Sequence, residues 1–149
     1  MPSYHDAVRA EIMARVKTLA TGLDGALSLK CQYDNLPFLQ PKASPWGRIE
    51  LVVGKTAPAA IGHRLNRTPL ILYLQVFIPE AAGTRIAWQA ADMMAEVFDY
   101  QTLSLGHAAD IGFQTASPPV SAGVKDGFRQ FNVTIDGSYD TEPSFVEPG

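Results

Sequence analysis

Residues 70–78, with the sequence LILYLQVFI, constrain the fold more than any other part of the chain. Successive side chains of a β-strand point to opposite faces, and the even-numbered positions here are all apolar. The odd-numbered positions add three large apolar side chains, Ile71, Tyr73 and Phe77. A strand that is apolar on both faces needs cover on both. Helices of the same chain can cover one face, and the other needs a further layer of this chain or another subunit.

The size and composition of the chain indicate one packed domain. The chain has 149 residues, which is the length of an ordinary single domain. Hydrophobic residues make up 46% and charged residues 18%, so the composition is that of a globular protein rather than a disordered one. We therefore expect a single domain over residues 1–149, with a flexible tail over residues 140–149.

Two helices are predicted because apolar residues recur every three to four positions in two stretches. The first covers residues 4–20, and Gly22 is expected to stop it. The second covers residues 85–98 and follows Thr84, whose hydroxyl can cap it.

Strands are predicted where apolar residues alternate with polar ones or run together between turn residues. They cover residues 27–33, 46–53, 70–78, 102–105, 108–116 and 131–135. Three loops separate them, because residues 34–45 and 117–130 are rich in proline and glycine and residues 55–66 are mostly polar or small. The expected fold class is α+β, a mostly antiparallel sheet of four to six strands with two helices packed on one face.

The charge balance and the cysteine count exclude several classes of protein. A net charge of −3 provides no basic field, so a dedicated DNA-binding protein is disfavoured. Cys31 is the single cysteine, which excludes an internal disulfide, a CxxC pair and a cysteine-rich zinc site. The N-terminal residues lack the pattern of a secretory signal, and no apolar stretch approaches the roughly 20 residues of a membrane span. We expect a soluble intracellular protein without a membrane partner.

Motifs that would indicate an enzyme are missing. The sequence has no GxSxG, GxxxxGK[ST] or GxGxxG motif, so we expect no catalytic and no cofactor-binding residue. The histidines show no spacing typical of a metal site, and they stand at His5, His63 and His107. Among the acids, Asp34 could pair with Glu50 or Asp126, although solvated surface carboxylates are the favoured interpretation.

The loop between the second and third strands carries a small basic cluster, Lys55, His63, Arg64 and Arg67. Such a cluster could contact phosphate. A solvated loop, or a contact with an acidic neighbouring protein, is the favoured alternative.

Two short motifs resemble those of a known family. Residues 33–38, YDNLPF, follow the first strand, and residues 74–79, LQVFIP, lead through Gly83 into an alanine-rich helix. In this order they are similar to the tail terminator family of long-tailed bacteriophages, over roughly residues 4–139. The long loop 55–66 and the proline-rich connection near Pro118 depart from the family's pattern.

The resemblance implies a structural protein of the phage virion, assembled in the host bacterial cytoplasm, with no enzyme activity and no cofactor. It implies a homo-hexameric ring that sits on the last ring of tail tube protein, stops tube polymerisation and presents a surface to the head-tail connector protein. DNA would pass through the ring without specific binding. Six copies at a charge of −3 each suit a neutral or acidic channel.

A ring subunit needs two different patches that fit each other. One patch of each subunit binds the other patch of the next subunit, and repeating this contact by rotation closes the ring. The second face of the third strand offers one such patch, and a side chain fully buried there would contribute about 1.5–3 kcal/mol. The residues expected at the subunit interface are Ile71, Tyr73, Phe77 and the helix residue Trp88. The basic cluster, Lys55, His63, Arg64 and Arg67, is expected to contact a neighbouring subunit or the connector.

Two alternatives remain. The chain could be a head-completion or neck protein of the same assembly, for which the demands on composition are alike. It could also be a small ligand-binding or enzymatic α+β domain whose site lies under residues 55–67 and uses Tyr73, Arg64 and His63.

Overall fold

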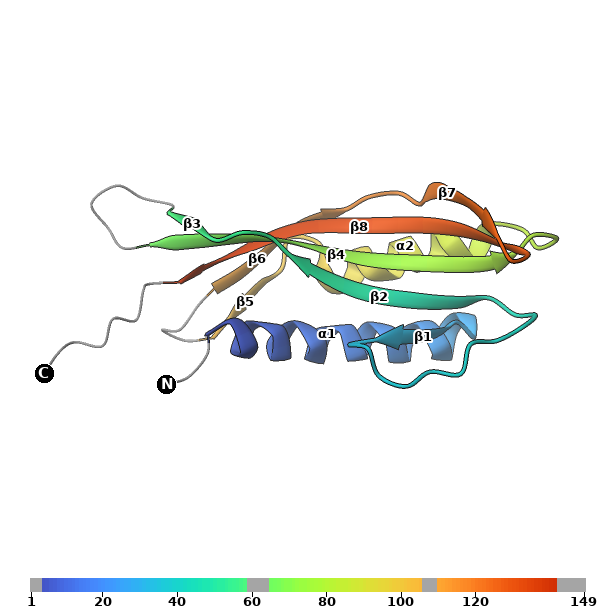
Figure 1. The fold of residues 1–149 in the computed structure, drawn as a ribbon, viewed down its shortest axis with the longest axis horizontal. Helices are drawn as coiled ribbons and strands as arrows, with labels where there is room; N and C mark the ends of the chain where they lie inside the picture. The colour runs from blue at the N-terminus through green and yellow to red at the C-terminus, as the bar shows by residue number, and fades with distance from the viewer. Residues whose placement is uncertain (1–3, 59–64, 106–109, 142–149) are drawn as a thin grey trace, which may run out of the picture.

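The computed structural model describes residues 4–58, 65–105 and 110–141, which hold two helices and eight strands (Figure 1). In chain order these are α1 (Tyr4–Leu27), β1 (Lys30–Tyr33), β2 (Trp46–Val53), β3 (Ala57–Pro58), β4 (Asn66–Pro79), α2 (Arg85–Phe98), β5 (Thr102–Ser104), β6 (Asp110–Ala116), β7 (Val120–Lys125) and β8 (Phe128–Thr141).

The strands form one curled sheet in the order β1-β2-β4-β8-β6-β5, with β3 paired to β4 and β7 paired to β8. β4 and β8 are the longest strands, and they pair antiparallel from Asn66 opposite Thr141 to Pro79 opposite Phe128. The pairings are antiparallel except that β1 runs parallel to β2. The α+β class is therefore confirmed, whereas four to six strands was too few and the sheet is mixed.

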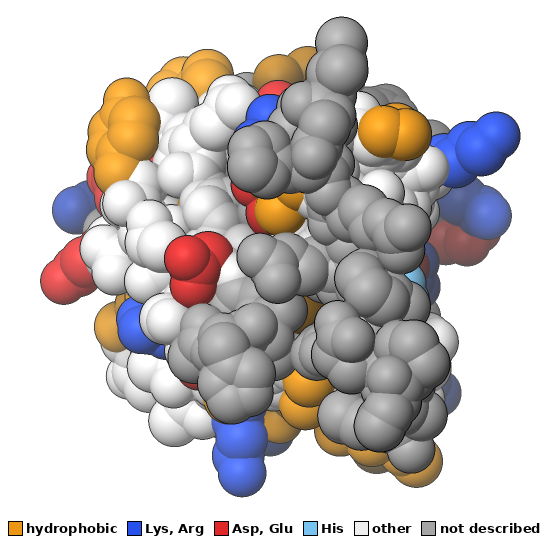
Figure 2. Space-filling model, turned by 90° about the vertical axis from the view of Figure 1, so that its left-hand side faces the viewer, with side chains coloured by type: hydrophobic (Ala, Val, Ile, Leu, Met, Phe, Trp, Pro, Cys, Tyr) orange, Lys and Arg blue, Asp and Glu red, His pale blue; other side chains and the backbone are white. Residues whose placement is uncertain are grey.

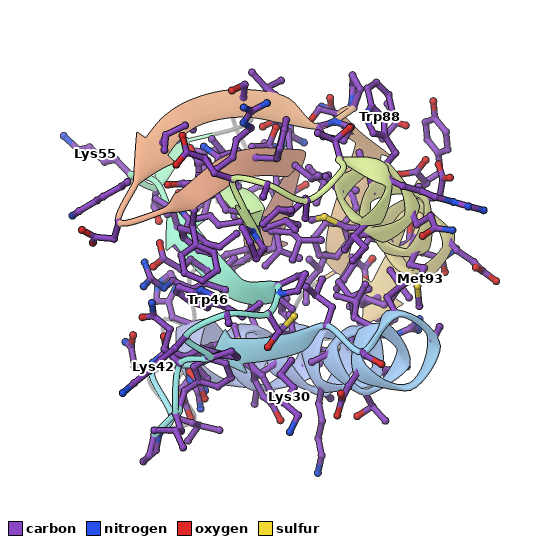
Figure 3. The ribbon with its side chains drawn as sticks, turned by 90° about the vertical axis from the view of Figure 1, so that its right-hand side faces the viewer. Lys30, Lys42, Trp46, Lys55, Trp88 and Met93 are labelled. Carbon is purple, nitrogen blue, oxygen red and sulfur yellow. The ribbon has the colours of Figure 1, made fainter. Side chains whose placement is uncertain are left out.

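The hydrophobic core lies between the two helices and one face of the sheet. Leu72 and Leu74 of β4 are completely buried there, together with Ile12 of α1 and Met94 of α2. Figure 3, seen along the strands, shows both helices on this side of the sheet. The opposite face, which we call the helix-free face, carries the odd-numbered residues of β4.

Helix α1 is longer than the sequence predicts. It continues through Gly22 and ends at Leu27, where Ser28 adopts a left-handed conformation with φ of 53°. A Cβ atom at position 22 would lie 3.3 Å from Cε of Met93 on α2. Gly22 is therefore not a stop signal, because its role is to let the two helices approach closely.

The extra helical turns shorten the strand that follows, so β1 begins at Lys30 rather than at residue 27. The prediction of α2 was right, with bounds of Arg85–Phe98, but the Thr84 hydroxyl makes no capping hydrogen bond. The third and last predicted strands are longer than expected, since β4 begins at Asn66 and β8 runs to Thr141.

Strand β7 lies inside the predicted loop 117–130 and forms a hairpin with β8. Asp126 and Gly127 connect the two strands, and both have positive φ, 55° and 80°. This is the conformation that two-residue hairpin turns require. Residues 108 and 109 of the predicted strand 108–116 lie outside the described residues, as do residues 142–149 of the expected tail.

Candidate interaction surfaces

The three β4 residues that the sequence assigns to an interface, Ile71, Tyr73 and Phe77, do lie together on the helix-free face, and each is half-buried. β4 is a central strand, flanked by β2 and β8. Their surroundings therefore consist of the neighbouring strands, and each of the three meets a different environment.

Phe77 is sheltered by its own chain. Its ring stacks on the indole of Trp46, with ring centroids 4.1 Å apart and an angle of 11° between the planes. Phe38, from the segment between β1 and β2, packs against Trp46, with the centroids of these two rings 5.8 Å apart. The guanidinium of Arg48 lies over both rings, 5.5 Å from Trp46 and 5.7 Å from Phe77, a favourable cation–π arrangement.

This aromatic stack joins the two motifs that the sequence singled out, since Phe38 belongs to YDNLPF and Phe77 to LQVFIP. Sequence reasoning missed Trp46 as the residue between them. Its position at the start of a strand directly after a proline-rich loop was the available signal. The two motifs thus meet at Trp46, which holds Phe38 of the segment 34–45 against the start of β2.

Two buried polar atoms near this stack have no hydrogen-bond partner within the described residues, namely Nε1 of Trp46 and Oε1 of Gln75. Both residues line a cavity of about 240 Å³, whose other walls include Phe128 of β8 and Asp126 of the β7–β8 turn. A buried polar group without a partner costs about 1–3 kcal/mol. One donor and one acceptor at the same cavity can receive a group that supplies both, such as an amide or a water molecule.

Tyr73 and Ile71 lie further along the helix-free face. Tyr73 stands opposite Glu50 of β2 and Thr134 of β8, and Ile71 stands opposite Val52 and Asp136 in the same strands. This part of the face mixes apolar and polar side chains, and Ser117, which follows β6, also contacts it, with its hydroxyl oxygen 3.4 Å from Oγ1 of Thr134.

Trp88 is not brought together with the β4 residues. It lies on α2 and is 54% exposed. Figure 3 shows it pointing away from α1, on the layer of the molecule that the helices form. Because the β4 residues face the other side of the sheet, Trp88 would have to serve a different contact.

The basic cluster is only partly described. Lys55 is exposed, whereas His63 and Arg64 lie outside the described residues. Arg67 forms a two-point ion pair with Asp140, from Nε to Oδ1 at 2.8 Å and from Nη2 to Oδ2 at 3.1 Å. These hydrogen bonds raise the pKa of Arg67 above its usual value. Figure 2 views this end of the molecule, where basic and acidic side chains are interspersed.

A groove of about 800 Å³ separates the first turns of α1 from β2. Met13, Leu51 and Val53 are among its apolar walls. Both Asp34 and Glu50 line the groove, but Asp34 binds Nη1 of Arg9 at 3.1 Å instead of pairing with another acid. Asp126 lies elsewhere, in the β7–β8 turn.

His5 also lines the groove, and its Nδ1 lies 2.5 Å from the hydroxyl oxygen of Tyr139. Among the described residues, no three His, Cys, Asp or Glu side chains gather closely enough to hold a metal ion. Neither helix has the combination of length and apolar character that a membrane-spanning segment needs, over the residues that the structure describes.

Comparison with known proteins identifies the family of this chain. The sequence model described as "Phage tail terminator protein" matches residues 7–139, nearly the whole described chain. The chain belongs to the phage tail terminator family. The family that the two motifs suggested is therefore confirmed, and with it a place among the structural proteins of phage tails.

The fold of this tail terminator also occurs among solved structures. One such structure is similar over 97% of this chain and 98% of its own, with a TM-score of 0.61 and 22% sequence identity. At this identity the likeness shows a shared fold and nothing about partners. No curated protein sequence matches the chain.

Proposed function

We propose that this tail terminator assembles into a six-membered ring on the last ring of the tail tube, ends tube growth there, and presents its other side to the head connector. The match to the family over residues 7–139 is the observation that carries this proposal. The role is structural rather than enzymatic, and the assembled ring is a part of the virion tail.

The shape of the molecule supports a subunit with two different ends. The strands run along its long axis, so connecting segments gather at both ends (Figure 1). One end holds the aromatic stack, the cavity beside Trp46 and the β7–β8 turn. The other end holds Lys55 and the Arg67–Asp140 ion pair. A ring that contacts the tube on one side and the connector on the other needs such unlike ends.

The charge of the chain supports passage of DNA through the ring. At −3 per copy, a ring of six has no net positive field that would retain duplex DNA through phosphate contacts. On this proposal the isolated protein binds duplex DNA weakly, and tight, salt-sensitive binding would contradict it.

The ligand-binding alternative receives no support from the described residues. Tyr73, one of its three expected polar groups, lies on the helix-free face of β4, and His63 and Arg64 lie outside the described residues. The described residues therefore do not test that site, and the family match is what favours the ring.

Size-exclusion chromatography with light scattering, followed by negative-stain microscopy, tests the proposal. Six-fold rings of about 97 kDa, six times the 16.1 kDa chain, are the expected result, free in solution or on the ends of purified tail tubes. A protein that stays monomeric and leaves tube ends bare would contradict it. A ligand that raises the melting temperature of such a monomer would favour the binding domain instead.

A further inference from the structure

One edge of the sheet is open along half of β2. β1 pairs with β2 only as far as Ile49. The Gly54 N–H donates to the carbonyl oxygen of Pro69 at 2.8 Å, and successive residues of an antiparallel ladder turn their backbone groups to alternate sides. Counting back from Gly54, Leu51 and Val53 direct their N–H and C=O groups away from β4. No described strand meets these groups.

The side chains at this open edge are apolar and uncovered. Val52 is 48% exposed and Val53 is 47% exposed. Beside them lies the groove between α1 and β2, with Val8 and Met13 on its α1 wall. An exposed edge strand with apolar side chains and free backbone groups is a template for another strand, and native proteins cover such edges.

β7 provides a second open edge on the far side of the sheet. Among the described strands it pairs with β8 alone, and all six of its residues are exposed. Val120 is 58% exposed and Val124 is 51% exposed. In the part of the chain that the structure describes, every exposed valine therefore lies either at the open edge of β2 or on β7.

We propose that β7 of one copy pairs with residues 50–53 of β2 in the next copy, so that the sheet continues from subunit to subunit around the ring. The inference rests on the proposed function, because it specifies how the ring closes. The two edges are different surfaces of one chain, which is what a head-to-tail contact between identical subunits requires.

The strand directions fit this pairing. β2, β4, β8 and β7 each run antiparallel to the next, so β2 and β7 point in opposite directions. Rotation about a ring axis preserves the direction of each strand relative to that axis. β7 of one copy therefore meets β2 of the next copy antiparallel, and the alternation continues across the subunit boundary.

The positions of the two edges along the strands also fit a closed ring. Gln130 of β8 pairs with the middle of β7 and also with Phe77 of β4, and Phe77 pairs with the start of β2. The middle of β7 therefore lies level with the start of β2, whereas the open edge of β2 lies near the end of that strand (Figure 1). The offset is about five residues over four strands, which corresponds to a strand tilt of about 40°. Closed sheets have strands tilted by roughly 35–45°.

Cysteine cross-linking tests the contact. The variant Val53→Cys/Val124→Cys is treated with a short bismaleimide and run on a denaturing gel. Covalent chains of two to six copies are expected, because each subunit offers one cysteine to each neighbour. Each single variant alone should stay monomeric, and a mixture of the two should give a covalent dimer and nothing larger. Burial raises the pKa of the native Cys31 to about 12, which keeps its background reaction low at pH 7.

A second variant measures the energetic role of the edge. Val53→Lys is expected to lower ring affinity at least tenfold, because it places a charge where the next strand packs. Val53→Ile should form rings normally. Tyr100→Ser, which removes an exposed aromatic side chain between α2 and β5, should also form rings.

The outcomes separate the inference from the proposed function. Rings that form normally but yield no covalent chains would overturn the edge pairing and leave the ring intact. Dimers from Val53→Cys alone would also overturn it, since they would show β2 pairing with itself. If the unmodified protein forms no ring in solution or on tube ends, the proposed function fails, and the inference fails with it.

Discussion

The two faces of β4 are built from the same strand but serve different purposes. On the covered face, Leu72 and Leu74 are completely enclosed by the helices. On the helix-free face, Ile71 and Tyr73 stay half-buried, and Gln75 interrupts the apolar row. Apolar residues on both faces do not mean equal burial on both. One row is enclosed in the core, and the other is covered only in part by neighbouring side chains of its own chain.

The largest effect is expected on the covered face. Leu74→Ala should lower the free energy of unfolding by about 2–5 kcal/mol, because the cavity that it leaves is enclosed on all sides. Urea unfolding followed by circular dichroism measures this. Tyr73→Ala is the matched control from the next position, and it should cost about 1 kcal/mol or less. Equal losses for the two variants would contradict the difference between the faces.

Phe77 is the exception on the helix-free face, and its substitution should have an intermediate effect. Phe77→Ala removes the partner of the stacked Trp46 ring, so we expect a loss of about 1–3 kcal/mol. A change in Trp46 fluorescence should accompany it. A loss below that of Tyr73→Ala would show that the aromatic stack contributes little to stability.

The indole N–H of Trp46, which has no partner among the described residues, gives a smaller and sharper test. Trp46→Phe keeps an aromatic ring against Phe77 but removes a buried donor without a partner. The relief of about 1–3 kcal/mol offsets the lost volume, so stability should change by about 1 kcal/mol or less. A large loss in urea unfolding would show that the indole N–H is satisfied in solution, for example by a bound water molecule.

The ion pair at the other end of the molecule should have the smallest effect. Arg67 and Asp140 are both at the surface, where solvent screens their attraction. Arg67→Ala should lower the melting temperature slightly at low salt and not at all in 1 M salt, because the Debye length falls to about 3 Å there. The raised pKa of Arg67 keeps it charged at every pH up to its usual value, so this contribution stays constant from neutral pH to about 12. A loss that persists in high salt would indicate a packing role.

The periodicity of the sequence was enough to predict both helices and the long central strands. When one side of an element is buried, apolar residues repeat along it with the period of that element, and a few exceptions do not remove the pattern. The role of Gly22 could not be predicted, since a glycine near a helix end and a glycine at a helix crossing look alike until Met93 is placed beside it. β7 was missed because all of its residues are exposed and Ser121, Ala122 and Gly123 interrupt the alternation of apolar and polar side chains. The Asp126-Gly127 pair was the available sign of its hairpin.

For the candidate interface, the sequence placed Ile71, Tyr73 and Phe77 on one face. It could not show that Trp46 and Phe38 already occupy part of that face, because this depends on how the loop 34–45 folds back. The two open edges also could not be predicted from the sequence. Whether a strand has a neighbour is a property of the whole sheet, and strand β1, which stops at Ile49 on β2, leaves no trace of that stop in the β2 sequence.

The pairing of β4 with β8 has a consequence during synthesis of the protein. Asn66 pairs with Thr141, so the central pair of the sheet cannot be completed until Thr141 has left the ribosome. Until then the apolar side chains of β4 are exposed to solvent, and contacts so distant in sequence form slowly. Translation that stops before Phe128 therefore yields no smaller version of this domain, only a chain destined for chaperones or proteases.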